Sequence, residues 1–239
     1  MTREAGHQWG TTRPDVLVFD VNETLIDFES MTAQFERIFN DPRVMREWLG
    51  HLIMYSMTIT LSGLYTDYFT LGQGLLRMVG DIHHVDVTDD DVDELKSAML
   101  SMPAHPDVES GLGRLRDAGF QLVSLTNSPP NPDGPTPLEK AGLADYIGRQ
   151  FSVGSVRAYK PAAGVYHLVA QELDVPASSC MMVAAHVWDT IGAQAAGFTS
   201  ALVTRPGNAP LPIPSLPQPN LVVPDLPALA DALAERWPR

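Results

Sequence analysis

The segment Val16–Leu25 reads VLVFDVNETL: four apolar residues lead into Asp20, and a polar Asn-Glu-Thr triplet soon follows. A short, continuous apolar run is typical of a strand inside a parallel sheet, where both faces are covered. Ligands of open α/β sheets bind outside the carboxyl ends of the strands. The segment therefore places Asp20 at a candidate site, although an aspartate that only caps a turn fits the same pattern.

The rest of the chain divides into a helical block and an alternating block. Consecutive helices are expected from Asp27 to about Met102, whereas helices and strands alternate from Pro103 onward. Alternation predicts an α/β fold with a doubly wound parallel sheet, and the helical block is then a cap over its carboxyl edge. We expect a loose N-terminal leader over residues 1–14, an α/β core over 15–29 and 104–239, and a helical cap over 30–103.

Local signals predict several helix boundaries. Asp41-Pro42 combines a capping side chain with proline, which favours a helix start. A second helix is expected to open at Thr66-Asp67 and to end at Gly80. Thr88 followed by three aspartates predicts a further start, because the helix dipole favours acidic side chains there. We interpret these aspartates as a solvated first turn rather than a metal cluster, and His83-His84 as a surface connection.

Composition excludes several classes of function. Of the 239 residues, 44% are hydrophobic and 19% are charged, as in a globular protein with a complete core. The formal net charge of -13 argues against nucleic acid or an anionic membrane as a partner. The sequence has a single cysteine, Cys180, no run near the roughly 18 apolar residues of a membrane span, and no apolar segment of a signal peptide. We therefore expect a cytoplasmic location.

Polar residues follow four segments of the alternating pattern, at or near expected strand ends. They are Asp20, Asn22 and Thr24; Thr126, Asn127 and Ser128; Lys160; and His186 with Asp189. In a parallel sheet the carboxyl ends of the strands lie at one edge, so these groups are expected to converge. Taken singly, each also fits a structural role, such as a turn former, a surface charge or a helix cap.

These motifs resemble those of the haloacid dehalogenase superfamily, and within it the L-2-haloacid dehalogenases of type II. The segments concerned are FDVNETL at Phe19–Leu25, LTNS at Leu125–Ser128, YKP at Tyr159–Pro161 with Tyr166 beyond it, and HVWD at His186–Asp189. The resemblance covers nearly the whole chain from Val16 onward. It implies the same α/β core with an inserted helical cap.

The resemblance also implies a role for each matched residue. Asp20 is expected to be the nucleophile that forms an ester with the substrate, while Thr24 orients its carboxylate. Lys160 is expected to keep that carboxylate ionised, and Asp189 to orient or activate the water that cleaves the ester. The remaining residues that the resemblance places at the substrate or beside it are Asn22, Thr126, Asn127, Tyr166, His186 and Trp188.

Several positions depart from the dehalogenase pattern. Asn22 stands where the family has an aromatic residue, and His186 replaces an asparagine. The cap arginine that grips halide or carboxylate in the family aligns with Leu49 here. We expect Arg46, one turn earlier, to substitute for it, with His51 as the alternative. A protonated His186 could also bind halide, or it could position water.

The leaving group separates a dehalogenase from a phosphatase. Phosphatases of this superfamily have a second aspartate two residues after the nucleophile, which protonates the departing alkoxide. Asn22 occupies that position and has no proton to give near neutral pH, whereas a halide leaves without protonation. Phosphatases also usually have two acidic residues near the last motif to hold Mg2+, where this chain has only Asp189. We therefore expect hydrolysis of a short 2-haloacid with no metal or other cofactor.

Two other functions stay open. One is a Mg2+-dependent phosphatase of a small phosphoester, and the other is a non-catalytic binding module that keeps the fold. We expect a small haloacid as the partner, with no nucleic acid and no membrane, and the resemblance suggests a homodimer. The halogen, the accepted chain length and the stereochemistry are not specified by these motifs.

Overall fold

The computed structural model of the protein describes residues 12–130 and 134–238. Most of the leader expected over residues 1–14 lies outside the described residues. The middle of the loop that the proline-rich sequence Pro129–Pro137 predicts also lies outside them.

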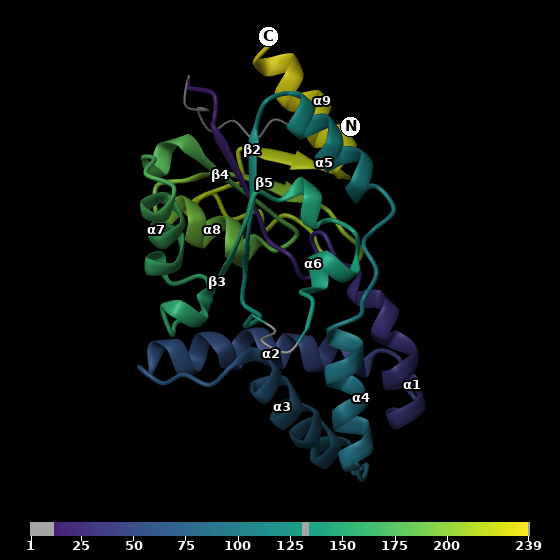
Figure 1. Ribbon diagram of the computed structural model, residues 1–239. Helices are drawn as coiled ribbons and strands as arrows, with labels where there is room; N and C mark the ends of the chain where they lie inside the picture. Colours follow the sequence, from purple (N-terminus) through teal and green to yellow (C-terminus); the bar gives the residue numbers. More distant parts are fainter. Residues whose placement is uncertain (1–11, 131–133, 239) are drawn as a thin grey trace.

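A six-stranded parallel sheet in the order β3-β2-β1-β4-β5-β6 forms the centre of the core (Figure 1). The strands are β1 Val16–Phe19, β2 Gln121–Thr126, β3 Arg149–Ser152, β4 Cys180–Ala184, β5 Thr199–Val203 and β6 Leu221–Val223. β1 pairs with β2 on one side and β4 on the other, and all four of its residues are fully buried. This position explains the continuous apolar sequence VLVF.

The strand order reverses beside β1, and this reversal positions the site. The chain moves outward from β1 through β2 to β3, then returns to the other side of β1 as β4. Such a reversal opens a crevice at the carboxyl ends of the two strands, and Asp20 follows β1 directly. The predicted α/β fold, with a doubly wound parallel sheet and a helical cap, is confirmed.

Helices cover both faces of the sheet. They are α5 Val108–Asp117, α6 Pro137–Lys140, α7 Ala163–Glu172, α8 Val187–Ala195 and α9 Leu226–Arg236. α5 packs against α9 on one face, and α7 packs against α8 on the other (Figure 1).

Four helices between β1 and α5 form a separate layer at the carboxyl edge of the sheet, in the lower part of Figure 1. They are α1 Thr32–Phe39, α2 Val44–Leu61, α3 Tyr68–His83 and α4 Asp89–Met99. Phe35, Trp48 and Leu95 are fully buried among them. The apolar side chains of these helices join those of the sheet in one continuous core, so the layer is packed firmly onto it.

Two expected helix starts in this layer are confirmed. Asp67 caps α3, because its carboxylate accepts the backbone N–H groups of Phe69 and Thr70. Thr88 and Asp91 form a reciprocal capping box at the start of α4. The acidic run after Thr88 therefore belongs to a helix start.

At the expected start Asp41-Pro42, the Asp41 carboxylate accepts the backbone N–H of Arg43 at 3.0 Å, so the capping contact is present and the regular helix α2 begins at Val44. One expected boundary is wrong. α3 continues past Gly80 and is capped by the left-handed residue His84. Gly80 serves close packing instead, since a Cβ there would lie 2.6 Å from the side chain of Val87.

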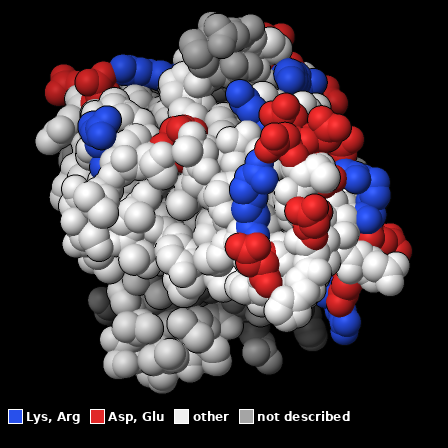
Figure 2. Space-filling view, turned by 90° about the horizontal axis from the view of Figure 1, so that it is seen from below, with Lys and Arg blue, Asp and Glu red and all other residues white. Residues whose placement is uncertain are grey.

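The surface of the cap is uneven in charge. Figure 2 shows this face with charged side chains gathered on the side of α1 and α4 and a broad uncharged area opposite. The charged side includes ion pairs of Arg37 with Asp91 and Glu94, and of Arg77 with Asp89. No helix within residues 12–130 and 134–238 has both the length and the apolar character needed to cross a membrane.

The packing of α5 against α9 predicts that Gly111→Ala is destabilising. A Cβ on Gly111 would lie 2.3 Å from the Cβ of Leu226, so the helices must separate, and we expect the free energy of unfolding to fall by about 1–3 kcal/mol. Gly50 in α2 is exposed with no atom within 4 Å of a Cβ, so Gly50→Ala should raise it by up to about 1 kcal/mol. Urea unfolding measures both, and equal effects would contradict this account of the packing.

Candidate active site

Asp20 follows the carboxyl end of β1 and is held by contacts with β4 and with the loop after β1. Its backbone N–H donates to the carbonyl of Val183 in β4 at 3.0 Å. The hydroxyl of Thr24 donates to Asp20 Oδ2 at 2.7 Å and accepts the backbone N–H of Ala185 at 2.9 Å. One oxygen of the Asp20 carboxylate is therefore fixed by a side chain that is itself anchored to the end of β4.

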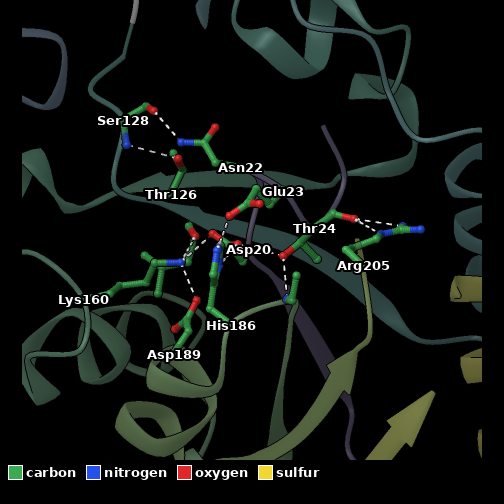
Figure 3. Close-up of polar contacts among 12 residues, drawn as sticks. Asp20, Asn22, Glu23, Thr24, Thr126, Ser128, Lys160, His186, Asp189 and Arg205 are labelled. Atoms are coloured by element: carbon green, nitrogen blue, oxygen red, sulfur yellow. Dashed lines mark hydrogen bonds and ion pairs between the residues drawn. The ribbon is translucent and has the colours of Figure 1, made fainter. Parts of the chain in front are cut away.

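Lys160 links Asp20 to Asp189. Its ammonium donates to Asp20 Oδ1 at 2.8 Å, to Asp189 Oδ2 at 2.6 Å and to the carbonyl of Leu125 at 3.0 Å. Lys160 and Asp189 have no exposed surface, and Figure 3 shows the ammonium between the two carboxylates. All three N–H donors of the lysine are used, so its position is closely defined.

The same contacts shift the pKa values of the two carboxyl groups in opposite directions. Burial alone would raise the pKa of Asp20, but Lys160 and His186 hold it well below its usual range. Burial and the charge of Asp20 raise the pKa of Asp189, and Lys160 offsets this only in part. A pair of carboxyl groups with pKa values pushed apart suits a division into a nucleophile and a base.

Asp189 lies in the first turn of α8 and has a second partner. The hydroxyl of Tyr166, from α7, donates to Asp189 Oδ1 at 2.7 Å. Burial and the charge of Asp189 raise the pKa of Tyr166 well above its ordinary value, so the phenol stays protonated and continues to donate. Asp189 is thus oriented from two sides, by Tyr166 and by Lys160.

A small cavity adjoins Asp20 beneath the cap. Its lining consists of Asp20, Asn22, Glu23, Leu49, Ile53, Tyr68, Asn127, His186 and Trp188. Its volume of about 10 Å³ is close to the space that one water molecule needs. Leu49, Ile53 and Tyr68 come from α2 and α3, so cap side chains must move before a small organic acid can enter.

The loop after β2 contributes unequally to this cavity. Asn127 lines it, and its Oδ1 accepts the backbone N–H of Lys160 at 3.1 Å. Asn22, from the loop after β1, also lines the cavity and donates to the hydroxyl of Ser128 at 3.2 Å. Thr126 does not: its hydroxyl oxygen accepts the N–H of Ser128 at 3.1 Å, and it lines a neighbouring cavity of about 310 Å³.

Leu49, which aligns with the family's cap arginine, lines the cavity, and Arg46 does not. The guanidinium of Arg46 forms ion pairs with Glu23 and Glu29 and donates to the carbonyl of Pro206 at 3.0 Å. Arg46 therefore reaches the site through Glu23, and its direct contact with substrate stays a prediction.

His51, the alternative to Arg46 in the cap, also lies outside the residues that line this cavity. It stands beside Tyr55, with the ring centroids 6.2 Å apart, and its Nε2 is 3.9 Å from the carboxylate of Glu47. Neither Arg46 nor His51, the two residues expected to replace the family's cap arginine, therefore lines the cavity beside Asp20.

The sequence motifs gave no role to Glu23, yet the structure places it at the centre of a second charged cluster. Its Oε2 lies 2.5 Å from His186 Nε2, and its other oxygen pairs with Arg46. Burial would raise the pKa of Glu23, but His186 and Arg46 hold it below its usual value. The available signal was an acidic residue between Asp20 and Thr24, on the same sheet edge as His186.

Arg205, which follows β5, is a second residue that the motifs missed. Its guanidinium donates to the carbonyl of Thr24 at 3.1 and 2.9 Å and pairs with Asp107 at 2.6 Å. It fixes the loop after β1 on the side of Thr24 that is away from Lys160 (Figure 3). Arginine after a short strand has no distinctive local pattern, so the sequence gave no reason to select it.

Among residues 12–130 and 134–238, no group of three His, Cys, Asp or Glu side chains is arranged to hold a metal ion. Two acidic groups of the site, Asp20 and Asp189, share the ammonium of Lys160. The ammonium of Lys160 is therefore the cation that lies between the two carboxylates.

A model of the haloacid dehalogenase-like hydrolase family matches residues 14–197. The chain belongs to this family. It is 28% identical over 190 residues to (S)-2-haloacid dehalogenase 1 of Pseudomonas sp. (strain CBS-3). The aligned region covers 79% of this chain and 83% of that protein. The chain is likewise 28% identical over 196 residues to (S)-2-haloacid dehalogenase 4A of Burkholderia cepacia, covering 81% and 84%.

Solved structures of haloacid dehalogenases share the fold. The L-2-haloacid dehalogenase of Xanthobacter autotrophicus, with chloropropionic acid covalently bound, matches with a TM-score of 0.81 at 23% identity. The match covers 95% of this chain and 100% of that chain. The resemblance inferred from the four motifs is confirmed.

The shared ammonium predicts a pH-dependent loss of stability in Lys160→Met. Two buried carboxylates would lose their counterion, and near pH 7.5 we expect the free energy of unfolding to fall by about 3–5 kcal/mol. In the wild type, the lowered pKa of Asp20 adds stability above about pH 4, which is lost in acid. In the variant the pKa of Asp20 rises above its unfolded value and the already raised pKa of Asp189 rises further, so the deficit should shrink as the pH falls toward about 5.

Lys140→Met is the matched control, because Lys140 is exposed at the end of α6. Its free energy of unfolding should change by no more than about 0.5 kcal/mol at any pH. Urea unfolding across the pH range measures both variants. A deficit in Lys160→Met that does not vary with pH would contradict the ion-pair account.

Proposed function

We propose that the protein hydrolyses short 2-haloalkanoic acids through an ester on Asp20, releasing halide and a 2-hydroxy acid. The relatives named (S)-2-haloacid dehalogenase support this choice within the family. The observation that carries it is the amide of Asn22, which lines the cavity and donates to Ser128. The position two residues after the nucleophile therefore has no carboxylic acid to protonate a leaving group, and a halide needs none.

In the first step the carboxylate of Asp20 attacks the halogen-bearing carbon. The new C–O bond forms as the C–halogen bond breaks, the bonding electrons depart with the halide, and the configuration of the carbon inverts. Lys160 holds Asp20 in its ionised form, and the buried setting removes water that would otherwise solvate the nucleophile. The cap contributes to this exclusion of water because its side chains cover Asp20 closely.

In the second step water attacks the carbonyl carbon of the Asp20 ester. Asp189 accepts the proton of that water, a role suited to its raised pKa and to its orientation by Tyr166 and Lys160. Thr24 and Lys160 donate toward the Asp20 oxygens, where negative charge develops. The ester bond then breaks, the proton held by Asp189 passes to the departing alkoxide, and the 2-hydroxy acid leaves with an oxygen of Asp20. Water supplies the replacement oxygen, and its second proton is released to solvent as Asp20 ionises again.

Substrate contacts come from the residues that line the cavity. Asn127 and His186 supply polar groups, and Trp188 supplies a wall. Direct contacts from Thr126 and Arg46 stay predictions, as does a homodimer.

Replacement of Asp20 by Asn should abolish turnover. We expect halide release from chloroacetate to fall by roughly 10³-fold or more, because the amide cannot form the ester. Wild-type halide release should be unaffected by EDTA. Asp81→Asn, a change at an exposed position of α3, is the control and should keep normal activity. Strict dependence of the wild type on Mg2+ would contradict the proposal.

A Mg2+-dependent phosphatase is the second candidate, and one observation favours it. His186 lines the cavity and has a raised pKa, so it could protonate a departing alkoxide in place of the missing aspartate. Hydrolysis of p-nitrophenyl phosphate in Mg2+, measured beside halide release from chloroacetate, separates the two functions. We expect the halide assay to be positive and the phosphate assay to be at background.

A further inference from the structure

A chain of three charged side chains connects the cap to the cavity beside Asp20. Arg46 on α2 of the cap pairs with Glu23 in the loop after β1, and Glu23 contacts His186 at the start of α8. Glu23 is 4% exposed and His186 is 7% exposed, so solvent does little to screen their charges. Three distant segments therefore meet at one buried carboxylate.

Glu23 holds this position at a cost. Its φ of 62° lies in the left-handed region, which glycine adopts freely and a glutamate adopts with strain. Its carboxylate is also removed from water, which is unfavourable unless cations replace the water. Such conformations persist where the surrounding structure imposes them, and they cluster at functional sites. Here His186 and Arg46 supply the compensating contacts.

The other ring nitrogen of His186 faces Asp20 at a distance longer than that of an ordinary hydrogen bond. This nitrogen, Nδ1, is buried, lies 3.5 Å from Asp20 Oδ2, and makes no well-formed hydrogen bond within the described part of the chain. Trp188 Nε1 is likewise buried without a partner there, and its ring stacks on His186 with centroids 5.0 Å apart. Both residues line the cavity beside Asp20. Two adjacent N–H groups, one held only loosely by Asp20 and the other without an acceptor, can receive an anion that enters the cavity.

The charged groups around His186 favour its protonated form. Asp20 and Glu23 face its two nitrogens, while the cations Lys160 and Arg46 lie beyond these carboxylates and are paired with them. Asp189 is further away, paired to Lys160.

Tyr68 also lines the cavity, and burial with the nearby negative charges keeps its phenol neutral by raising its pKa. Burial lowers the pKa of His186, but contacts with Asp20 and Glu23 outweigh this and raise it to about 9.

We propose that Glu23 is a positioning residue that holds His186 as an imidazolium, with Nδ1–H directed at the anion that binds beside Asp20. The inference rests on the proposed function, in which that anion is the substrate carboxylate or the departing halide. Glu23 accepts the hydrogen bond from Nε2–H, so Nδ1–H is the donor that remains on the side of the cavity. The cation that the cap does not present directly is thus supplied from the core, with Arg46 supporting Glu23.

The kinetic test compares Glu23→Gln with wild type across pH, using halide release from chloroacetate. Glutamine keeps the shape and removes the charge, so His186 should lose its proton at lower pH. Near pH 6 the variant should retain kcat/KM close to wild type, and near pH 8.5 it should lose about tenfold. Glu29→Gln is the matched control, because Glu29 also pairs with Arg46 but does not touch His186. It should leave the pH profile unchanged.

A double-mutant cycle tests whether Glu23 acts through His186. In the His186→Asn background the high-pH limb should disappear, and Glu23→Gln should add little further loss. If Glu23→Gln lowers kcat/KM equally at every pH, or adds its full loss to His186→Asn, Glu23 does not act by charging His186. Either result overturns the proposal.

Imidazole 15N NMR of the intact protein provides a readout that needs no turnover. The His186 signals, assigned with His186→Asn, should show both nitrogens protonated through about pH 8 in wild type, with the midpoint lowered in Glu23→Gln but not in Glu29→Gln. A wild-type midpoint near the ordinary histidine value would overturn the proposal. If the wild type releases no halide from chloroacetate, the proposed dehalogenase function is wrong. The NMR midpoints then still test, independently of turnover, whether Glu23 keeps His186 protonated.

Discussion

The buried ammonium of Lys160 is the contact on which the rest of the site depends. It lies within 2.8 Å of Asp20 and 2.6 Å of Asp189, with all three groups removed from solvent. Without it, two carboxylates would face each other in a region of low dielectric, which is strongly unfavourable. With it, the Asp20 carboxylate is ionised and Asp189 is the weaker acid. This division suits the two steps of the proposed hydrolysis through an ester.

The strand order explains why these groups meet. Asp20 follows the central strand β1, Asp189 follows β4 on one side, and Lys160 follows β3 on the other, so all converge where the order reverses. The cap closes this crevice with apolar and aromatic side chains rather than with a free cation. Positive charge at the cavity comes instead from the core, through His186 and its partner Glu23.

The sequence predicted the parts of this arrangement that depend on local pattern. Apolar runs ending in polar residues located Asp20 and Asp189, and the parallel alternation brought Lys160 to the same edge. Contacts between distant segments were not predictable in the same way. Arg46 was expected to face the substrate, but its ion pair with Glu23 depends on how the cap packs. Gly80 was expected to end a helix, yet tertiary packing determines its role.

The most direct test of the account is a search for the ester on Asp20. Asp189→Asn should slow the second step and leave the first intact, so incubation with chloroacetate in EDTA should accumulate the intermediate. Peptide mass spectrometry should then find a carboxymethyl group on Asp20, and the group should be absent from Asp20→Asn incubated in the same way. An unmodified Asp20 in an enzyme that still releases halide, or a carboxymethyl group on another residue, would contradict the central claim.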